Sequence, residues 1–253
     1  MDLGLTDRVY VLTGASRGLG YATAECLVAD GARVVLSARD ADGVAAAAER
    51  LGGPGRAVGL AVDLTDPTAP ERLVAAARDH FGRLDGALVS VGGPPPGSVA
   101  SVSDEQWRRS FETVFLGAVR MVRTVAAELS DGGAIGLVLS TSARGPLPGL
   151  GISNGLRPGL VGAAKDIADE YGPRGVRVVG LLPGRIMTDR NRELFAATGD
   201  PDRARAEAEA GIPLRRIGEP AEFGRVAAFV LSPAASYLTG VTVPVDGGAL
   251  RGL

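Results

Sequence analysis

The first residues whose spacing suggests chemistry are Gly14, Gly18 and Gly20, in the segment Thr-Gly-Ala-Ser-Arg-Gly-Leu-Gly that ends at Gly20. Glycines at such points allow a tight turn and let the backbone approach a ligand closely. A short apolar, β-branched run precedes the segment, and apolar residues at helical spacing follow it. The free N–H groups at the start of that helix would face an anion. The segment therefore predicts a site for the pyrophosphate of a dinucleotide.

A second chemical feature follows the next apolar run, which ends in Ser37-Ala38-Arg39-Asp40. A carboxylate at this strand tip would accept hydrogen bonds from the ribose 2′-hydroxyl of NAD. Here Asp40 lies slightly beyond the tip, whereas Arg39 is available and Arg17 is nearby in the glycine loop. Arginine binds phosphate in a bidentate way. The sequence favours NADP(H) over NAD(H), with a merely solvated Arg39 as the alternative.

The elements that would position these residues alternate along the chain. Apolar, β-branched runs predict strands, and apolar residues at helical spacing predict helices. The strands are expected at 8–13, 33–37, 57–62, 86–91, 134–140 and 176–182, and the helices at 18–30, 70–81, 103–130 and 156–171. This alternation is typical of an α/β protein with a doubly wound parallel sheet covered on both faces.

Two segments interrupt the alternation. A stiff Gly-Gly-Pro-Pro-Pro-Gly loop occupies 92–97, just after a predicted strand. A polar segment with weak helical character, 188–213, follows a Pro-Gly turn where a substrate-covering lid would lie. No linker long enough to separate domains is evident, so we expect one domain over 1–253 with a lid insertion.

Composition excludes several classes of function. The chain has 253 residues, of which 45% are hydrophobic and 22% charged, with a net charge of -2. It carries no basic surplus for nucleic acid and no apolar run long enough for a membrane span or a signal peptide. A single cysteine and a single histidine argue against disulfides and a metal site. We expect a soluble cytoplasmic protein that binds small molecules.

Several motifs together resemble the short-chain dehydrogenase/reductase family. Besides the glycine loop, Asp63 matches an aspartate beside the adenine, and Leu182-Pro-Gly-Arg-Ile-Met-Thr188 resembles a segment bordering the nicotinamide. The resemblance covers nearly the whole chain and is nearest to the 3-oxoacyl-carrier-protein-reductase-like branch. It implies a Rossmann fold, a nicotinamide cofactor, oxidoreductase activity, and a homo-oligomer, either a tetramer or a dimer, built on the long helices and the C-terminal strand.

The resemblance also implies which residues contact the cofactor. They lie in the glycine loop, at the tips of the following strands and around the Pro-Gly turn. The expected set is Gly14, Ser16, Arg17, Gly18, Leu19, Gly20, Arg39, Asp63, Leu64, Gly92, Arg157, Pro183, Gly184, Ile186 and Thr188.

The family's chemistry rests on Asn, Ser, Tyr and Lys, and the match here is incomplete. Ser140 matches the serine, but Ser153 stands at the tyrosine position and Arg157 at the lysine position. Val114 stands at the asparagine position, and Asn154 adds an amide beside Ser153. The candidate catalytic set is therefore Ser140, Ser153, Asn154 and Arg157.

The single lysine, Lys165, does not restore the motif in another register. Val161 stands four residues before it and cannot transfer a proton. Eight residues of helix past Arg157 also rotate the side chain by about 80° and carry it about 12 Å along the axis. We expect Lys165 to be a structural or surface residue.

Three functions remain open at this point. The first is an NADP(H)-dependent oxidoreductase acting on a carbonyl or hydroxyl of a small organic substrate, with Ser140 and Ser153 binding the oxygen and Arg157 supplying charge. Losing a positioned acid would slow such an enzyme by about 10²–10⁴-fold. The alternatives are a non-redox lyase, isomerase or cyclase, and an inactive dinucleotide-binding subunit.

Overall fold

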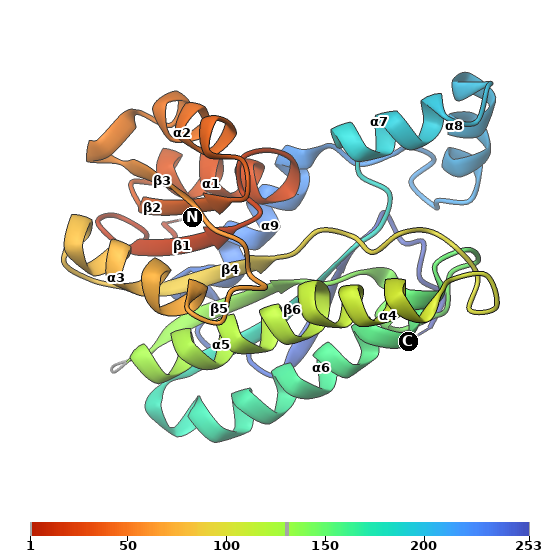
Figure 1. Ribbon diagram of the computed structural model, residues 1–253. Coiled ribbons are helices and arrows are strands. Elements are labelled where there is room, and N and C mark those ends of the chain that lie inside the picture. Colours follow the sequence, from red (N-terminus) through yellow and green to blue (C-terminus); the bar gives the residue numbers. More distant parts are fainter. Residues whose placement is uncertain (1, 130–131, 253) are drawn as a thin grey trace.

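The core of the fold is a parallel sheet of seven strands in the order β3-β2-β1-β4-β5-β6-β7 (Figure 1). The computed structural model describes residues 2–129 and 132–252. The strands are β1 (Val9–Thr13), β2 (Arg33–Ala38), β3 (Ala57–Ala61), β4 (Gly86–Ser90), β5 (Gly133–Val138), β6 (Val176–Pro183) and β7 (Val241–Val245). Consecutive strands run outward in both directions from β1 and β4. The connections that leave the carboxyl ends of β1 and β4 therefore run in opposite directions and leave a crevice between them, the usual ligand site of such sheets.

Helices cover both faces of the sheet (Figure 1). The helices α1 (Gly18–Ala29), α2 (Ala41–Arg50) and α9 (Pro220–Leu231) pack on one face, and α3 (Ala69–Phe81), α5 (Gly117–Glu128) and α6 (Gly151–Tyr171) pack on the other. Each face buries its own apolar cluster. The predicted α/β architecture with a doubly wound parallel sheet is confirmed.

Most predicted elements lie within a few residues of the observed ones. The sequence reading placed no element at α2, α9 or β7. α2 is rich in alanine, which gives little apolar periodicity, and the observed β7 is a partly exposed edge strand. Among the helices that the structure describes, none has both the length and the apolar character that a membrane crossing needs.

The predicted helix over 103–130 is not one regular helix. It begins as α4 (Asp104–Ser110), passes through a π-helical segment (Phe111–Leu116), and continues as α5. The start of α4 is closed by a reciprocal capping box between Ser103 and Gln106. A π-helical turn inside a helix often marks a functional site. Here it carries Val114, which is 2% exposed.

The largest correction concerns the start of α6. The sequence predicts a helix from residue 156, whereas α6 begins at Gly151. Glycine and Pro158 lower the helix propensity of this stretch, but the first turns bury Ile152 and Leu156 against Val114. Packing therefore outweighs local propensity. The result places Ser153 and Asn154 in the first turn of a helix.

The segment after β6 forms an arm that projects from the body of the molecule (Figure 1). We call α7 (Asp189–Ala196) and α8 (Pro201–Ala210) the α7–α8 arm. The two helices agree with the weakly helical stretches read from the sequence. A small apolar cluster of Phe195, Ile212 and Ile217 anchors the base of the arm.

Candidate active site

The carboxyl ends of β1 and β4 are joined by a side chain at the point where the strand order reverses. The hydroxyl of Thr13 donates to the carbonyl oxygen of Ser90 and accepts from the Ser90 N–H, both at 2.8 Å. Thr13 is fully buried. A Cβ on Gly14 would lie 2.7 Å from the same Ser90 carbonyl oxygen. Glycine is therefore required for the glycine loop to leave the sheet here.

The glycine loop then turns into α1 and leaves the helix start open. Gly14 and Gly18 have φ values of +58° and +63°, in the left-handed region that favours glycine. A Cβ on Gly20 would lie 2.7 Å from the Gly14 carbonyl oxygen, so α1 packs closely on the loop. Arg17 is the N-cap residue, and no side chain caps the helix. These residues fit a pyrophosphate, which the first N–H groups of α1 would bind.

Three arginines lie around the place expected for the adenosine end of a dinucleotide. Arg17 and Arg39 are exposed, and the predicted contact with a phosphate needs side chains that a ligand can reach. The third, Arg50 at the end of α2, was missed. Its guanidinium lies 4.7 Å from the ring centroid of Tyr21, with Nε 3.2 Å from the Tyr21 hydroxyl and Nη2 3.5 Å from the carbonyl oxygen of Ser16. The sequence around Arg50 gave no signal of this role, because only the packing of α2 brings Arg50 to the glycine loop.

The acidic residues near this end lie beyond the strand tips. Asp40 is exposed at the N-cap of α2 and makes no side-chain capping hydrogen bond. Asp63 is exposed after β3, and its carboxylate accepts from the Thr65 N–H at 3.0 Å, which fixes the turn containing Leu64. The Asp63 side chain is thereby held at the same edge of the sheet as the glycine loop.

Three serines lie between the end of β5 and the first turn of α6. Ser140 follows β5, and its Oγ accepts from the Ser142 N–H at 3.1 Å, so its own hydroxyl proton stays available. The hydroxyls of Ser142 and Ser153 lie 2.9 Å apart and are buried, at 2% and 5% exposure. Ser142 was not predicted, because its role depends on the unexpected start of α6. We call Ser140, Ser142 and Ser153 the serine cluster.

Arg157 lies one turn along α6 from Ser153 and is 4% exposed. Its Nη1 donates to the carbonyl oxygen of Val138 at 2.9 Å, and its Nε is buried without a hydrogen-bond partner among the described residues. Burial, and to a smaller extent the nearby charge of Arg190, lowers the pKa of Arg157 to about 10. The guanidinium still carries its charge at neutral pH.

The fourth candidate, Asn154, is occupied elsewhere. Its Oδ1 accepts from the Leu147 N–H and its Nδ2 donates to the Leu147 carbonyl oxygen, both at 2.9 Å. The amide therefore holds the loop before α6, and both of its polar atoms are already paired. Asn154 does not join the serine cluster.

The residues expected to border the nicotinamide lie on two neighbouring loops. Gly92 is exposed after β4. Pro183 ends β6, Gly184 donates its N–H to Val245 at 3.0 Å, and Ile186 is 3% exposed. A Cβ on Gly18 would lie 3.8 Å from the Thr188 methyl carbon, so this loop reaches the glycine loop.

Several other charged residues bind partners within the protein, and Arg190 lies near the site. Arg144 binds Thr242 through its side chain, and Arg185 lies over the ring of Phe195. Lys165 is exposed and pairs with Asp169 at 2.9 Å, so the prediction of a surface role is confirmed. Arg190, at the start of the α7–α8 arm, donates to the carbonyl oxygens of Gly93 and Pro94. The described residues hold no cluster of metal-ligating side chains.

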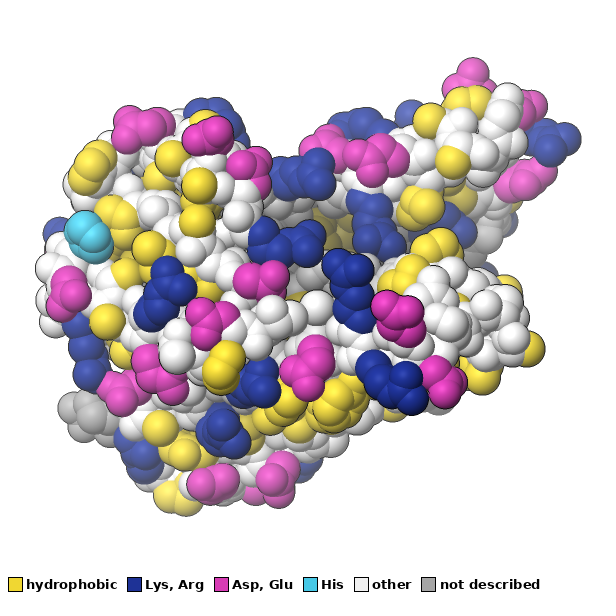
Figure 2. Space-filling view, viewed as in Figure 1, with side chains coloured by type: hydrophobic (Ala, Val, Ile, Leu, Met, Phe, Trp, Pro, Cys, Tyr) yellow, Lys and Arg dark blue, Asp and Glu magenta, His cyan; other side chains and the backbone are white. Residues whose placement is uncertain are grey.

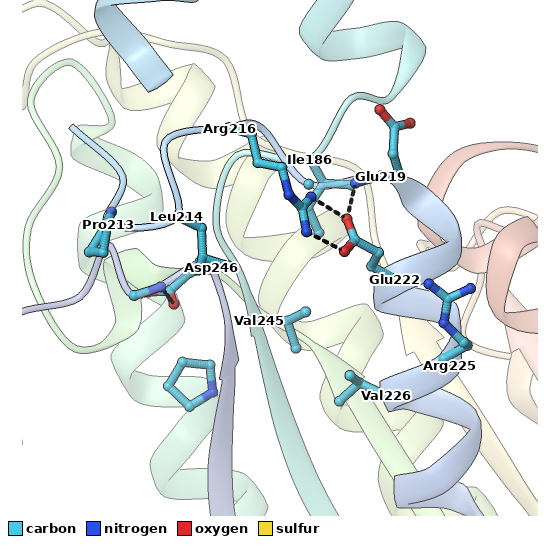
Figure 3. A pocket seen from close by; sticks show the side chains of 14 residues that line it. Ile186, Pro213, Leu214, Arg216, Glu219, Glu222, Arg225, Val226, Val245 and Asp246 are labelled. Atoms are coloured by element: carbon cyan, nitrogen blue, oxygen red, sulfur yellow. Dashed lines mark hydrogen bonds and ion pairs between the residues drawn. The ribbon is translucent and has the colours of Figure 1, made fainter. Parts of the chain in front are cut away.

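A cavity of about 730 Å³ lies apart from the serine cluster, between the start of α9 and β7 (Figure 3). Arg216 and Glu222 point toward one another at its wall and form a two-pronged ion pair at 2.7 and 2.6 Å. Glu222 also accepts from the Glu219 N–H at 2.8 Å. None of the serine cluster or Arg157 lines this cavity. The ion pair at its wall is satisfied within the protein, and the candidate catalytic residues lie elsewhere.

Comparisons with known proteins agree with this architecture. A family model described as "Enoyl-(Acyl carrier protein) reductase" matches residues 14–249. The chain is 34% identical to human dehydrogenase/reductase SDR family member 4, over 96% of this chain and 88% of that protein. It is 32% identical to 3-oxoacyl-[acyl-carrier-protein] reductase of Escherichia coli, over 97% and 98% of the two chains.

A solved structure is similar over its whole length. L-sorbose reductase from Gluconobacter frateurii, complexed with NADPH and L-sorbose, matches with a TM-score of 0.92, 30% identity and 100% coverage of both chains. The sheet order, the glycine loop and these matches lead to one conclusion. The chain belongs to the short-chain dehydrogenase/reductase family and is an oxidoreductase of that type.

Proposed function

We propose that the protein is an NADPH-dependent reductase of a small carbonyl compound, with a remodelled catalytic site formed by Ser140, Ser153 and Arg157. The observation that carries the proposal is the buried pairing of Ser142 and Ser153, one helical turn from the buried charge of Arg157. These groups lie at the carboxyl ends of the strands, the edge where the open start of α1 also lies. The NADPH complex of L-sorbose reductase supports the choice of cofactor.

The reaction we propose adds a hydride to the carbonyl carbon and a proton to its oxygen. When bound, the reduced nicotinamide supplies the hydride, and the carbonyl π-electron pair moves onto oxygen. The hydroxyl group of Ser140 donates a hydrogen bond to that oxygen. Ser142 and Ser153 share one hydrogen bond, so one of the two hydroxyls also has a proton to donate. Both contacts strengthen as negative charge develops.

The proton itself comes from water in this proposal. A serine hydroxyl is a weak acid compared with a phenol of pKa about 10, so the serine cluster positions the oxygen and relays the proton. Arg157 stabilises the developing charge without giving up a proton, because its pKa of about 10 keeps it protonated at neutral pH. Asn154 has no part in this scheme, since its amide is paired with Leu147.

The test is NADPH oxidation over a panel of ketones, quinones, acyl thioesters and oxo acids, with Ser153→Ala and a matched control, Ser98→Ala. We expect Ser153→Ala to lower kcat by about 10²-fold, in the range for loss of an oxyanion donor. Ser98 lies on an exposed loop, so its variant should be unchanged. Equal turnover in both variants would contradict the assigned site. NADPH binding without turnover of any compound would favour the inactive-subunit alternative.

We also propose that the protein forms a homo-oligomer. Edge strand β7 and the turn before it expose Tyr237 fully and Val241 to 43%, and Phe111 on the other face is exposed to 43% and stacked on Phe115. Aromatic side chains are enriched in subunit interfaces relative to the rest of a protein surface. Light scattering should give the mass of a dimer or tetramer, and a monomer at micromolar concentration would exclude the proposal.

A further inference from the structure

The buried guanidinium of Arg157 has no counter-charge among the residues that the structure describes. Among residues 2–129 and 132–252, no carboxylate forms an ion pair with it. Its single hydrogen bond goes to a neutral carbonyl, that of Val138. The charged group that bears on its pKa is Arg190, which has the same sign. A buried, unpaired charge is costly, so a residue of this kind is kept where a ligand supplies the opposite charge.

A second guanidinium, that of Arg190, is close enough for its charge to act on Arg157. Arg190 comes from α7 and binds the carbonyl oxygens of Gly93 at 3.3 Å and Pro94 at 3.2 Å. These residues directly follow β4, which pairs with the end of β5 through Ser90 and Val138. Both arginines therefore converge on the carboxyl ends of β4 and β5. Arg190 also takes part in no ion pair among the described residues.

Basic side chains are prominent on one face of the molecule. Figure 2 shows Lys and Arg side chains gathered around the hollow between the body of the molecule and the α7–α8 arm. The chain as a whole carries a net charge of -2. The positive charge is thus local to the hollow, where it would attract and hold an anion.

The phosphates of a dinucleotide do not explain Arg157. Their place is the start of α1, beyond β1, whereas Arg157 binds the end of β5. The sheet order puts β4 between those two strands, which separates the two positions by about 10 Å at the spacing of neighbouring strands. The nicotinamide ribose is nearer but neutral. A negatively charged group of the substrate would supply the missing counter-charge.

We propose that Arg157 and Arg190 bind a carboxylate of the substrate, which makes the substrate class a carbonyl compound that also carries a carboxylate. Ser153 and Arg157 are one helical turn apart, so their side chains are neighbours on α6. A carboxylate on the arginines therefore places a carbonyl a few bonds away at the serine cluster, as in a 2-oxo acid. This inference rests on the proposed function, since it names the substrate of the same site.

The test uses isothermal titration with benzoylformate and its uncharged methyl ester, on the protein with and without NADP⁺. The variants are Arg190→Gln and a matched control, Arg192→Gln. Arg192 lies on the same helix, and its guanidinium pairs with Asp189 at the surface. We expect benzoylformate to bind at least tenfold more tightly than the ester. Arg190→Gln should remove that preference and Arg192→Gln should retain it.

The outcomes separate this inference from the proposed function. If NADPH binds but benzoylformate binds no better than its methyl ester, the carboxylate site is wrong and the proposed function stands. If NADPH does not bind, the proposed function fails. If Arg190→Gln weakens NADPH and leaves benzoylformate unchanged, the arginines serve the cofactor phosphates, and the carboxylate assignment is overturned.

Discussion

The burial of Arg157 has an energetic consequence for the protein without ligands. A guanidinium with one neutral partner and a like charge nearby opposes folding, because the charge loses water without gaining a counter-ion. Replacing even a buried ion pair with apolar side chains of similar volume is often neutral or stabilising by about 1–4 kcal/mol, and Arg157 has no counter-ion to lose among the described residues. The unpaired Val138 carbonyl would offset about 1–3 kcal/mol of that gain.

We therefore predict that Arg157→Met leaves the protein more stable while abolishing turnover. The net gain should be about 1 kcal/mol, or about 2–4 °C in Tm for a chain of this size. Differential scanning calorimetry without ligands measures it. A large drop in Tm would mean that Arg157 is a structural residue whose charge is compensated, contrary to the role proposed here.

Glu222 gives a pH dependence whose sign follows from its partners. Hydrogen bonds from Arg216, and then from the Glu219 N–H, lower its pKa from 4.5 to about 2. A carboxyl with a depressed pKa stabilises the fold above pH 4.5, and this stabilisation is lost as the pH falls toward 2. The pair is partly exposed, so solvent screening reduces the contribution to about 1 kcal/mol.

Glu222→Gln should thus weaken the dependence of stability on pH between 4.5 and 2, and lower stability at pH 7 by that amount. Urea unfolding at several pH values measures both effects. Glu170→Gln is the control, because Glu170 is exposed and forms no ion pair among the described residues. Identical pH profiles for the two variants would show that the Arg216–Glu222 pair contributes nothing.

At the scale of elements, the start of α6 decides where Ser153 lies. Gly151 donates its N–H to the Gly97 carbonyl oxygen at 2.8 Å, and Gly97 donates to the Gly149 carbonyl oxygen at 2.7 Å. A Cβ on Gly151 would lie 2.7 Å from the backbone nitrogen of Val99. The proline-rich loop is therefore clamped against the helix start, and only glycine allows this contact.

We predict that Gly151→Ala destabilises the protein by about 1–3 kcal/mol through overpacking against backbone and shifts Ser153, with a loss in kcat. The control is Gly162→Ala in the same helix, where a Cβ meets no atom within 4 Å. That change should stabilise by about 0.5–1 kcal/mol, because alanine favours the helix. Chemical denaturation compares the two. Similar stabilities would show that α6 does not depend on the close contact.

The sequence was sufficient for the elements that local pattern controls. The strands β1 to β6 carry apolar runs, and the spacing of the glycine loop reflects backbone geometry, so both could be located before the structure, whereas β7 could not. The start of α6 could not, because glycine and proline oppose a helix there and only the burial of Ile152 against Val114 favours it. Ser142, Arg50 and Arg190 were missed for the same reason. Each gains its place through packing between segments distant in sequence.

In the whole molecule, the candidate cofactor and catalytic residues lie at two ends of one crevice. The glycine loop and the arginines around it lie at one end, and the serine cluster with Arg157 lies at the other. The sheet order explains both positions, since the connections after β1 and β4 run in opposite directions. Basic side chains gather around the hollow, although the chain as a whole carries a net charge of -2 (Figure 2). The preference for NADPH over NADH is therefore the property that tests the assignment of this crevice to a dinucleotide.

The most direct measurement is a fluorescence titration of NADPH and NADH against the protein, Arg39→Asp and the control Arg56→Asp on the turn before β3. A charged hydrogen bond to the 2′-phosphate contributes about 1.5–3 kcal/mol, so NADPH should bind at least about tenfold more tightly than NADH. Arg39→Asp should abolish or reverse this ratio, and Arg56→Asp should retain it. Absence of NADPH binding, or a ratio unchanged by Arg39→Asp, would contradict the account.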